Sequence, residues 1–202
     1  MQEVSVIIPN FNGMAYLDGV LAGLECQSVN NFEVILVDNG SSDGSCAFVA
    51  ARYPWVHLIE LPENFGFCKA VNEGIKASRA PYVLLLNNDI EVTENFIEEM
   101  IFAIKRHPKA FSCAARMIQF HDRDKLDDAG NYYCALGWAY ARGKGKDIHI
   151  YEKEEKIFAS CAGAAIYRKK LFDKIGYFDE EHFAYLEDMD VGYRARIHGY
   201  EN

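Results

Sequence analysis

Short apolar segments alternate with helical patterns over the first half of the chain, from Val4 to about His107. The apolar segments are VSVII (4–8), FEVILV (32–37), VHLIEL (56–61) and YVLLL (82–86). Strands that alternate with helices form parallel βαβ units, in which helices cover both faces of one sheet. The sequence therefore predicts an α/β fold with a mostly parallel, Rossmann-like sheet flanked by helices.

The pattern loosens after Pro108. Two strand candidates, FSCAARMIQF (111–120) and FASCAGAAIY (158–167), flank a polar, irregular stretch over 121–156, and a helix is expected over 187–200. A chain of 202 residues suffices for one domain and is marginal for two. We therefore expect a single domain over 1–202. Because the chain stops abruptly after the last helical pattern, we also expect that it lacks a C-terminal extension.

Composition restricts the class of protein. Half of the residues are apolar and a quarter are charged, as in soluble globular proteins. The net charge of −9 argues against a general nucleic-acid-binding protein, which would carry a basic face. The six cysteines form no CxxC pair, and neither a signal peptide nor a membrane span is recognisable. These features predict a cytoplasmic protein with reduced thiols.

Polar residues follow three of the predicted strands. Asn10 to Asn12 follow the first strand, Asp38 the second, and Asn87 to Asp89 the fourth. Asn and Asp are common in turns, which is the simpler interpretation of each site. The carboxyl ends of parallel strands share one edge of a sheet, however, and ligands bind at that edge. The chain has neither GxGxxG nor GxxxxGK[ST], so a divalent cation is the economical way to hold a phosphate.

Two further segments carry candidate functional residues. NFGFCKAVNEG contains Asn64, Lys69 and Asn72, and its simpler interpretation is a loop followed by a solvated helix face. Glu187 and Asp188 lie in the first turn of the last predicted helix. Acidic residues there suit the helix dipole, and the alternative is that one carboxylate is a general base.

Five motifs occur together in an order that resembles the inverting family-two glycosyltransferases of the GT-A fold. They are VSVIIPNFNG, VILVDNGSSDGS, ENFGFCKAVNEGI, YVLLLNNDIEV and the segment from GAAIYRKKLF to YRARIHGY, which together extend from Val4 to Tyr200. The rhamnosyltransferase-like branch is the most similar, because it also shows segments like DDAGNYY (127–133) and ARGKGKD (141–147).

The resemblance implies a nucleoside-diphosphate sugar donor, Mg²⁺ or Mn²⁺ as cofactor, and direct displacement at the anomeric carbon. It implies a nucleotide-binding half over 1–107 and an acceptor and catalytic half over 108–202. Asp188 corresponds to the catalytic base, Glu187 to its partner in the ED pair, and Asp89 to the metal-binding aspartate. The residues implied at the donor are Pro9, Asn10, Phe11, Asp38, Asn64, Lys69, Asn87, Asn88, Gly163 and Ala164.

The expected reaction moves a sugar, for which a deoxyhexose such as rhamnose is the candidate, to a hydroxyl of a polysaccharide or lipid-linked glycan. That acceptor places the protein at the inner face of the cell membrane, with peripheral association as a further expectation. The chain departs from the family pattern at Asn87, where an aspartate is usual. A nucleotide-sugar-binding domain without activity and a sugar-nucleotide nucleotidyltransferase are the two alternatives. The latter expects a basic phosphate loop near the first strand, and PNFNGMAYLDG contains neither Lys nor Arg.

Overall fold

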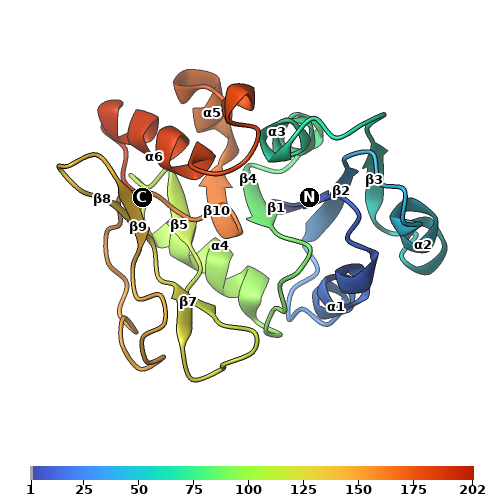
Figure 1. Ribbon diagram of the computed structural model, residues 1–202, viewed down its shortest axis with the longest axis horizontal. Coiled ribbons are helices and arrows are strands. Elements are labelled where there is room, and N and C mark those ends of the chain that lie inside the picture. Colours follow the sequence, from blue (N-terminus) through green and yellow to red (C-terminus); the bar gives the residue numbers. More distant parts are fainter. Residues whose placement is uncertain (1) are drawn as a thin grey trace.

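A six-stranded mixed sheet forms the centre of the protein, which is described over residues 2–202 by a computed structural model (Figure 1). The strand order is β3-β2-β1-β4-β10-β5. These strands are β1 (Val4–Asn10), β2 (Phe32–Asp38), β3 (His57–Glu60), β4 (Tyr82–Leu86), β5 (Ser112–Ala114) and β10 (Ala164–Arg168). The predicted α/β class and the four predicted strands of the first half are confirmed.

Strand direction decides which residues meet at the ligand-binding edge. β1 pairs in parallel with β2, with Asn10 opposite Asp38, and in parallel with β4 on its other side. The carboxyl ends of these three strands therefore lie at the same edge. β10 runs antiparallel to β4, with Ala164 opposite Leu86. Consequently the beginning of β10, rather than its end, lies beside the polar residues that follow β4.

Helices cover both faces of the sheet (Figure 1). They are α1 (Met14–Glu25), α2 (Ser45–Arg52), α3 (Phe67–Ala77), α4 (Phe96–Arg106), α5 (Lys169–Ile175) and α6 (Glu187–Ile197), with a 3-10 turn η1 (Glu180–His182). Alternate side chains of each strand point to opposite faces. Val6 and Ile8 of β1 accordingly pack with α1, α2 and α4. Ile7 packs with α3, α5 and α6.

The second half is more regular than its polar sequence suggests. The stretch predicted to be irregular contains β7 (Leu126–Asp128), β8 (Asn131–Tyr133) and β9 (Ala139–Ala141); β7 pairs with β6 (Met117–Ile118), and β8 pairs with β9. The strand predicted over 111–120 is wrong as one element, because it divides into β5 and β6. The strand predicted over 158–167 is regular only from Ala164. Within residues 2–202, none of the helices has both the length and the apolar character that a membrane crossing requires.

Candidate active site

Three polar side chains at the carboxyl edge form one hydrogen-bonded row across β2, β1 and β4. Asn10 Nδ2 donates to Asp38 Oδ2 over 2.8 Å, and Asn88 Nδ2 donates to Asn10 Oδ1 over 2.7 Å. The other oxygen of Asp38 accepts the backbone N–H of Ser41. Since each amide has its NH₂ side committed, the row fixes the orientation of both Asn side chains. The polar residues that follow these strands are thus brought together, as the sequence predicted.

Two members of this row, Asp38 and Asn10, are buried. The Asp38 side chain is 1% exposed, so its carboxylate faces the protein rather than an open binding surface. Burial and the nearby Asp38 raise the pKa of the Cys46 thiol to about 12, which keeps this group neutral. A Cβ at Gly13 would lie 2.0 Å from Asn88 Nδ2 and 2.3 Å from Asn10 Oδ1. Glycine at this position therefore leaves the room in which the two amides meet.

Asp89 is the candidate metal ligand, and its surroundings fit a cation whose remaining ligands come from phosphate and water. Asp89 is exposed, and no hydrogen bond or ion pair occupies its carboxylate within residues 2–202. No cluster of three or more Asp, Glu, His or Cys side chains in the same range could hold a metal without other ligands. Mg²⁺ commonly binds one or two carboxylates together with phosphate oxygens and water. One free carboxylate beside the amides of Asn87 and Asn88 supplies the protein's share of such a site.

The acid pair and Asn87, the first residue of the candidate metal-binding segment, line one cavity of 490 Å³, which we call the site cavity; Asn88 and Asp89 lie outside its lining. Its lining includes Asn87, Gly163, Glu187 and Asp188, together with the aromatic side chains of Tyr140 and Tyr185. The backbone N–H of Asn87 donates to Gly163 O over 2.9 Å, which ties the end of β4 to the loop before β10. Residues about 100 positions apart are thus placed around one space large enough for a small ligand.

The acid pair lies at the start of α6 in surroundings that favour protonated carboxyls. Burial, followed by the charge of Glu187, raises the pKa of Asp188 from 3.8 to about 6. Burial also raises the pKa of Glu187, whose Oε2 is buried and has no hydrogen-bond partner within the described chain. A carboxyl with a pKa near 6 is ionised at neutral pH and remains basic enough to accept a proton, as a general base requires.

A third acid and an amide that sequence analysis did not select lie beside Asp188. Burial raises the pKa of Asp128 to about 6, and the charge of Asp188 adds to this rise. The hydrogen bond from the backbone N–H of Gly130 acts in the opposite direction. Asn131 Nδ2 donates to Asp188 Oδ2 over 2.9 Å. Both residues belong to the segment DDAGNYY, which the sequence analysis used only for resemblance. The available signal was an acidic pair before Gly-Asn in an otherwise irregular stretch.

These raised pKa values predict that stability falls as pH rises from about 4.5 to 7.5. Over this window the native state keeps protons on Asp128 and Asp188 that the unfolded state has already released. Each group should contribute a loss of about 1–2 kcal/mol in the free energy of unfolding between these pH values. Urea unfolding at pH 4.5 and 7.5 measures the difference, and Asp128→Asn should reduce it.

The neighbouring Asp127 provides the matched control, since it is less buried and pairs with Lys144. Asp127→Asn should leave the pH difference in place. If Asp128→Asn and Asp127→Asn change the pH dependence equally, burial of Asp128 is not its cause.

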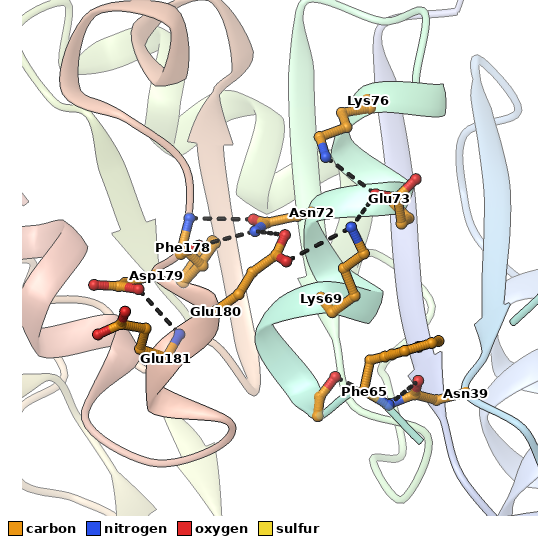
Figure 2. A network of polar contacts seen from close by, with 11 residues as sticks. Asn39, Phe65, Lys69, Asn72, Glu73, Lys76, Phe178, Asp179, Glu180 and Glu181 are labelled. Atoms are coloured by element: carbon orange, nitrogen blue, oxygen red, sulfur yellow. Dashed lines mark hydrogen bonds and ion pairs between the residues drawn. The ribbon is translucent and has the colours of Figure 1, made fainter. Parts of the chain in front are cut away.

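The remaining donor candidates lie outside the site cavity. Phe11 is exposed in the loop after β1, and Ala164 is buried at the start of β10. Asn64 Oδ1 accepts from Asn39 Nδ2 and from the backbone N–H of Gly66, which shapes the loop before α3. The Lys69 ammonium pairs with Glu73 at 3.1 Å and with Glu180 at 3.6 Å (Figure 2). Asn64 and Lys69 thus have structural partners, and their role at the donor stays a prediction.

Asn72 is not on a solvated helix face, and that interpretation was wrong. Its side chain is 2% exposed, and Nδ2 donates to Phe178 O while Oδ1 accepts the Phe178 N–H (Figure 2). Nδ2 also reaches Glu180 Oε1 over 3.1 Å. The Asn72 side chain thereby satisfies both backbone groups of Phe178, as a neighbouring strand would. It holds the segment between α5 and α6 against α3.

A second contact anchors the same segment closer to the acid pair. Phe183 O accepts the backbone N–H of Phe67 over 2.7 Å, so the segment caps the N-terminus of α3. Phe183, Tyr185 and Leu186 all have positive φ, between 55° and 73°. Such backbone conformations are costly for residues other than glycine and persist only where surrounding contacts impose them. The contacts of Asn72 and Phe183 thus fix the path of the backbone that leads into α6 and its acid pair.

Comparison with solved structures identifies the class of fold. TarS of Staphylococcus aureus, as residues 1–349, superimposes with a TM-score of 0.70 at 22% identity, covering 96% of this chain and 55% of that chain. It has also been solved in complex with UDP-GlcNAc. The mannosyltransferase PcManGT of Pyrobaculum calidifontis, in complex with GDP-Man and Mn²⁺, gives 0.72 at 16% identity, over 98% of this chain and 53% of that chain. The fold is that of a GT-A glycosyltransferase.

The chain belongs to glycosyl transferase family 2, whose family model matches residues 5–176. A Mycobacterium tuberculosis protein named N-acetylglucosaminyl-diphospho-decaprenol L-rhamnosyltransferase is 26% identical over 94% of this chain and 69% of its own length. An uncharacterized glycosyltransferase of Rickettsia typhi is 27% identical over 95% of this chain and 58% of its own. This chain thus spans little more than half the length of the Rickettsia relative and of both solved chains. The family match excludes the nucleotidyltransferase alternative.

Proposed function

We propose that the protein transfers a sugar from a nucleoside diphosphate to a hydroxyl group of a glycan or lipid-linked sugar, with inversion at the anomeric carbon. The observation that carries the proposal is the site cavity, in which Asp188 and Glu187 share one space with Asn87 and Gly163. A transferase of this kind needs a base for the acceptor on one side and a diphosphate-binding site on the other. In this proposal the acid pair supplies the base, and the segment 87–89, of which Asn87 lines the cavity, supplies the diphosphate-binding site.

In this proposal the residues act in two groups. Asp188 accepts the acceptor proton as the new bond forms, since an alcohol is a weak nucleophile at neutral pH. Asp89, with Asn87 and Asn88, holds a divalent cation, which when bound offsets charge on the departing diphosphate. Gly163 and Ala164 border the sugar. Glu187 keeps Asp188 in place at the start of α6.

The row at the sheet edge serves the nucleoside. The exposed ring of Phe11, next to Pro9, offers a flat apolar surface for a base. Asp38 is buried, so it acts by orienting Asn10 and the loop at Ser41 rather than through an open carboxylate. Loss of Asp38 therefore weakens nucleoside binding by disordering the edge.

The relatives support a narrower version of the proposal. The name of the mycobacterial relative specifies the transfer of an L-rhamnosyl group and the substrate N-acetylglucosaminyl-diphospho-decaprenol. We infer that this chain uses a deoxyhexose donor and a lipid-linked acceptor at the inner face of the cell membrane, in association with its surface. Polysaccharide biosynthesis of the cell envelope is the process in which such a transfer belongs.

A thermal-shift screen tests the proposal. Nucleoside diphosphates and their sugars, with and without Mn²⁺, should raise the melting temperature, because ligands of the native state stabilise it by mass action. At 100 times the Kd the gain is about 2.7 kcal/mol, and the largest shift should require both nucleotide and cation. Nucleoside monophosphates lack the second phosphate and are the matched control. If no nucleotide shifts the melting temperature, the donor assignment fails; binding without turnover would instead favour the inactive-domain alternative.

A further inference from the structure

The hydrogen bond between Asn131 and Asp188 joins residues that are 57 positions apart and belong to different elements. Asn131 begins β8, whereas Asp188 lies in the first turn of α6. Both line the site cavity. The amide thus contacts the carboxylate from a second element that lines the space in which the acceptor is expected.

The backbone of Asn131 is held on two sides, which fixes the point from which its side chain extends. Its N–H donates to Ala159 O over 3.0 Å, and its O accepts from the N–H groups of Phe158 and Ala159. On the other side it pairs with Ala141 across the β8–β9 ladder. Because the backbone is already ordered, only the side-chain rotamers have to be fixed when the amide binds its partner.

The ionisable groups around Asp188 do not stabilise its negative charge, so a hydrogen-bond donor such as the Asn131 amide matters for its ionisation. Glu187 on α6, Asp128 on β7, Cys161 before β10 and Tyr167 on β10 all face the same region. Two of these groups are carboxyls, and none of the four carries positive charge. Within residues 2–202, no Lys, Arg or His side chain forms an ion pair with Asp188, and the nearest cation that acts on the pair is His182, which affects Glu187. Hydrogen bonds from the backbone N–H groups of Met189 and Ala162 lower the pKa of Asp188, and the Asn131 amide adds a side-chain donor to them.

We propose that Asn131 is a positioning residue for Asp188: its amide N–H orients the carboxylate toward the site cavity and favours the charged form. This inference deepens the proposed function, on which it rests for the role of Asp188 as base. A hydrogen bond to the charged form of an acid lowers its pKa, so the amide counteracts part of the effect of burial and of Glu187. It keeps the base ionised at neutral pH.

Carbon-detected NMR titration of the Asp188 carboxyl tests the role without any substrate. The signal is assigned by its absence in Asp188→Asn. Asn131→Ala should raise the pKa of Asp188 by about one to two pH units, because a charge-assisted hydrogen bond is lost. Asn131→Asp keeps the shape and adds a like charge, so it should raise the pKa further and give two coupled titration steps.

Tyr132→Phe is the matched control. Tyr132 follows Asn131 in β8 and points to the other face of the strand, where its hydroxyl bonds to Lys156 O. The change removes two hydrogen bonds, the one donated to Lys156 O and the one accepted from Arg142 Nη1, and should leave the Asp188 titration where it is. If Asn131→Ala does not fold, Asn131→Leu, which is close to asparagine in shape and has no donor, gives the same reading. An Asp188 titration that is unchanged in either variant would overturn the proposal.

The pH dependence of turnover provides a second reading on active protein. In Asn131→Ala the acidic limb of the pH profile of kcat/KM should shift to higher pH by the same one to two units. At pH 9, where Asp188 is ionised in the variant as well, the loss of activity that is due to protonation should disappear, and the loss that is due to misorientation should remain. The two proposals fail separately. Loss of the base role would show as an active Asp188→Asn variant, whereas loss of the positioning role would show as an unshifted titration.

Discussion

Asp188→Asn should lower turnover by about 10²- to 10⁴-fold while nucleotide and metal affinity stay close to those of the parent. The substitution preserves the shape of the side chain and removes its basicity. Because burial and Glu187 raise the pKa of Asp188 to about 6, the carboxylate is ionised at pH 7 and is still a competent base. The same burial makes its charge costly, so the variant should also be more stable at neutral pH.

Asp190→Asn is the matched control for this experiment. Asp190 lies two residues further along α6, where it pairs with Arg194 at 2.6 Å. It does not line the site cavity. Its substitution should change turnover by no more than a few-fold. A parental turnover in Asp188→Asn would reject Asp188 as the base, and an equally slow Asp190→Asn would show that the loss is not specific to Asp188.

Asp89→Ala should abolish the dependence of nucleoside-diphosphate binding on Mg²⁺ or Mn²⁺. Asp89 is the exposed carboxylate in the polar segment after β4, and the chain has no Gly-rich loop to hold a diphosphate instead. Loss of a charged ligand should weaken binding by about 10- to 150-fold when the cation is present. Calorimetry with Mn²⁺, and again with excess chelator, separates the two parts of the affinity.

Glu91→Ala is the matched control for Asp89→Ala. Glu91 is exposed two residues further on and pairs with Arg123 at 2.8 Å. Its removal changes the net charge by the same amount and should preserve the effect of the cation. Equal affinity of the parent with Mn²⁺ and with chelator would contradict the metal assignment outright.

The sheet edge was predictable because it depends on local patterns. The alternation of apolar strands and helices defines parallel units, and parallel strands bring the residues after them to one edge. Asn10, Asp38 and Asn88 could therefore be grouped from sequence, although their hydrogen-bonded row could not. The resemblance to a known family, rather than periodicity, selected Asp188 among the acids of the last helix.

The residues that sequence analysis missed depend on contacts between distant segments. Asn131 and Asp128 approach Asp188 only because β7 and β8 fold back over the start of α6. Asn72 has the helical spacing of a surface residue, and its buried partner is a backbone group 106 positions away. Periodicity shows which residues are polar. It does not show which polar side chain satisfies a buried backbone group.

The antiparallel pairing of β10 with β4 also sets the order in which the protein can assemble during synthesis. β4 leaves the ribosome about 80 residues before its partner, which at about 5–20 residues per second is a delay of about 4–16 seconds. During this interval the hydrogen-bonding groups along one side of β4 have no strand to pair with. An unpaired apolar edge attracts other chains, and nascent chains are protected from this by chaperones. The loop at Cys161 to Gly163, which lines the site cavity, leads directly into the strand that joins β4 to β5, so an enzyme arrested before residue 164 would be both inactive and prone to aggregate.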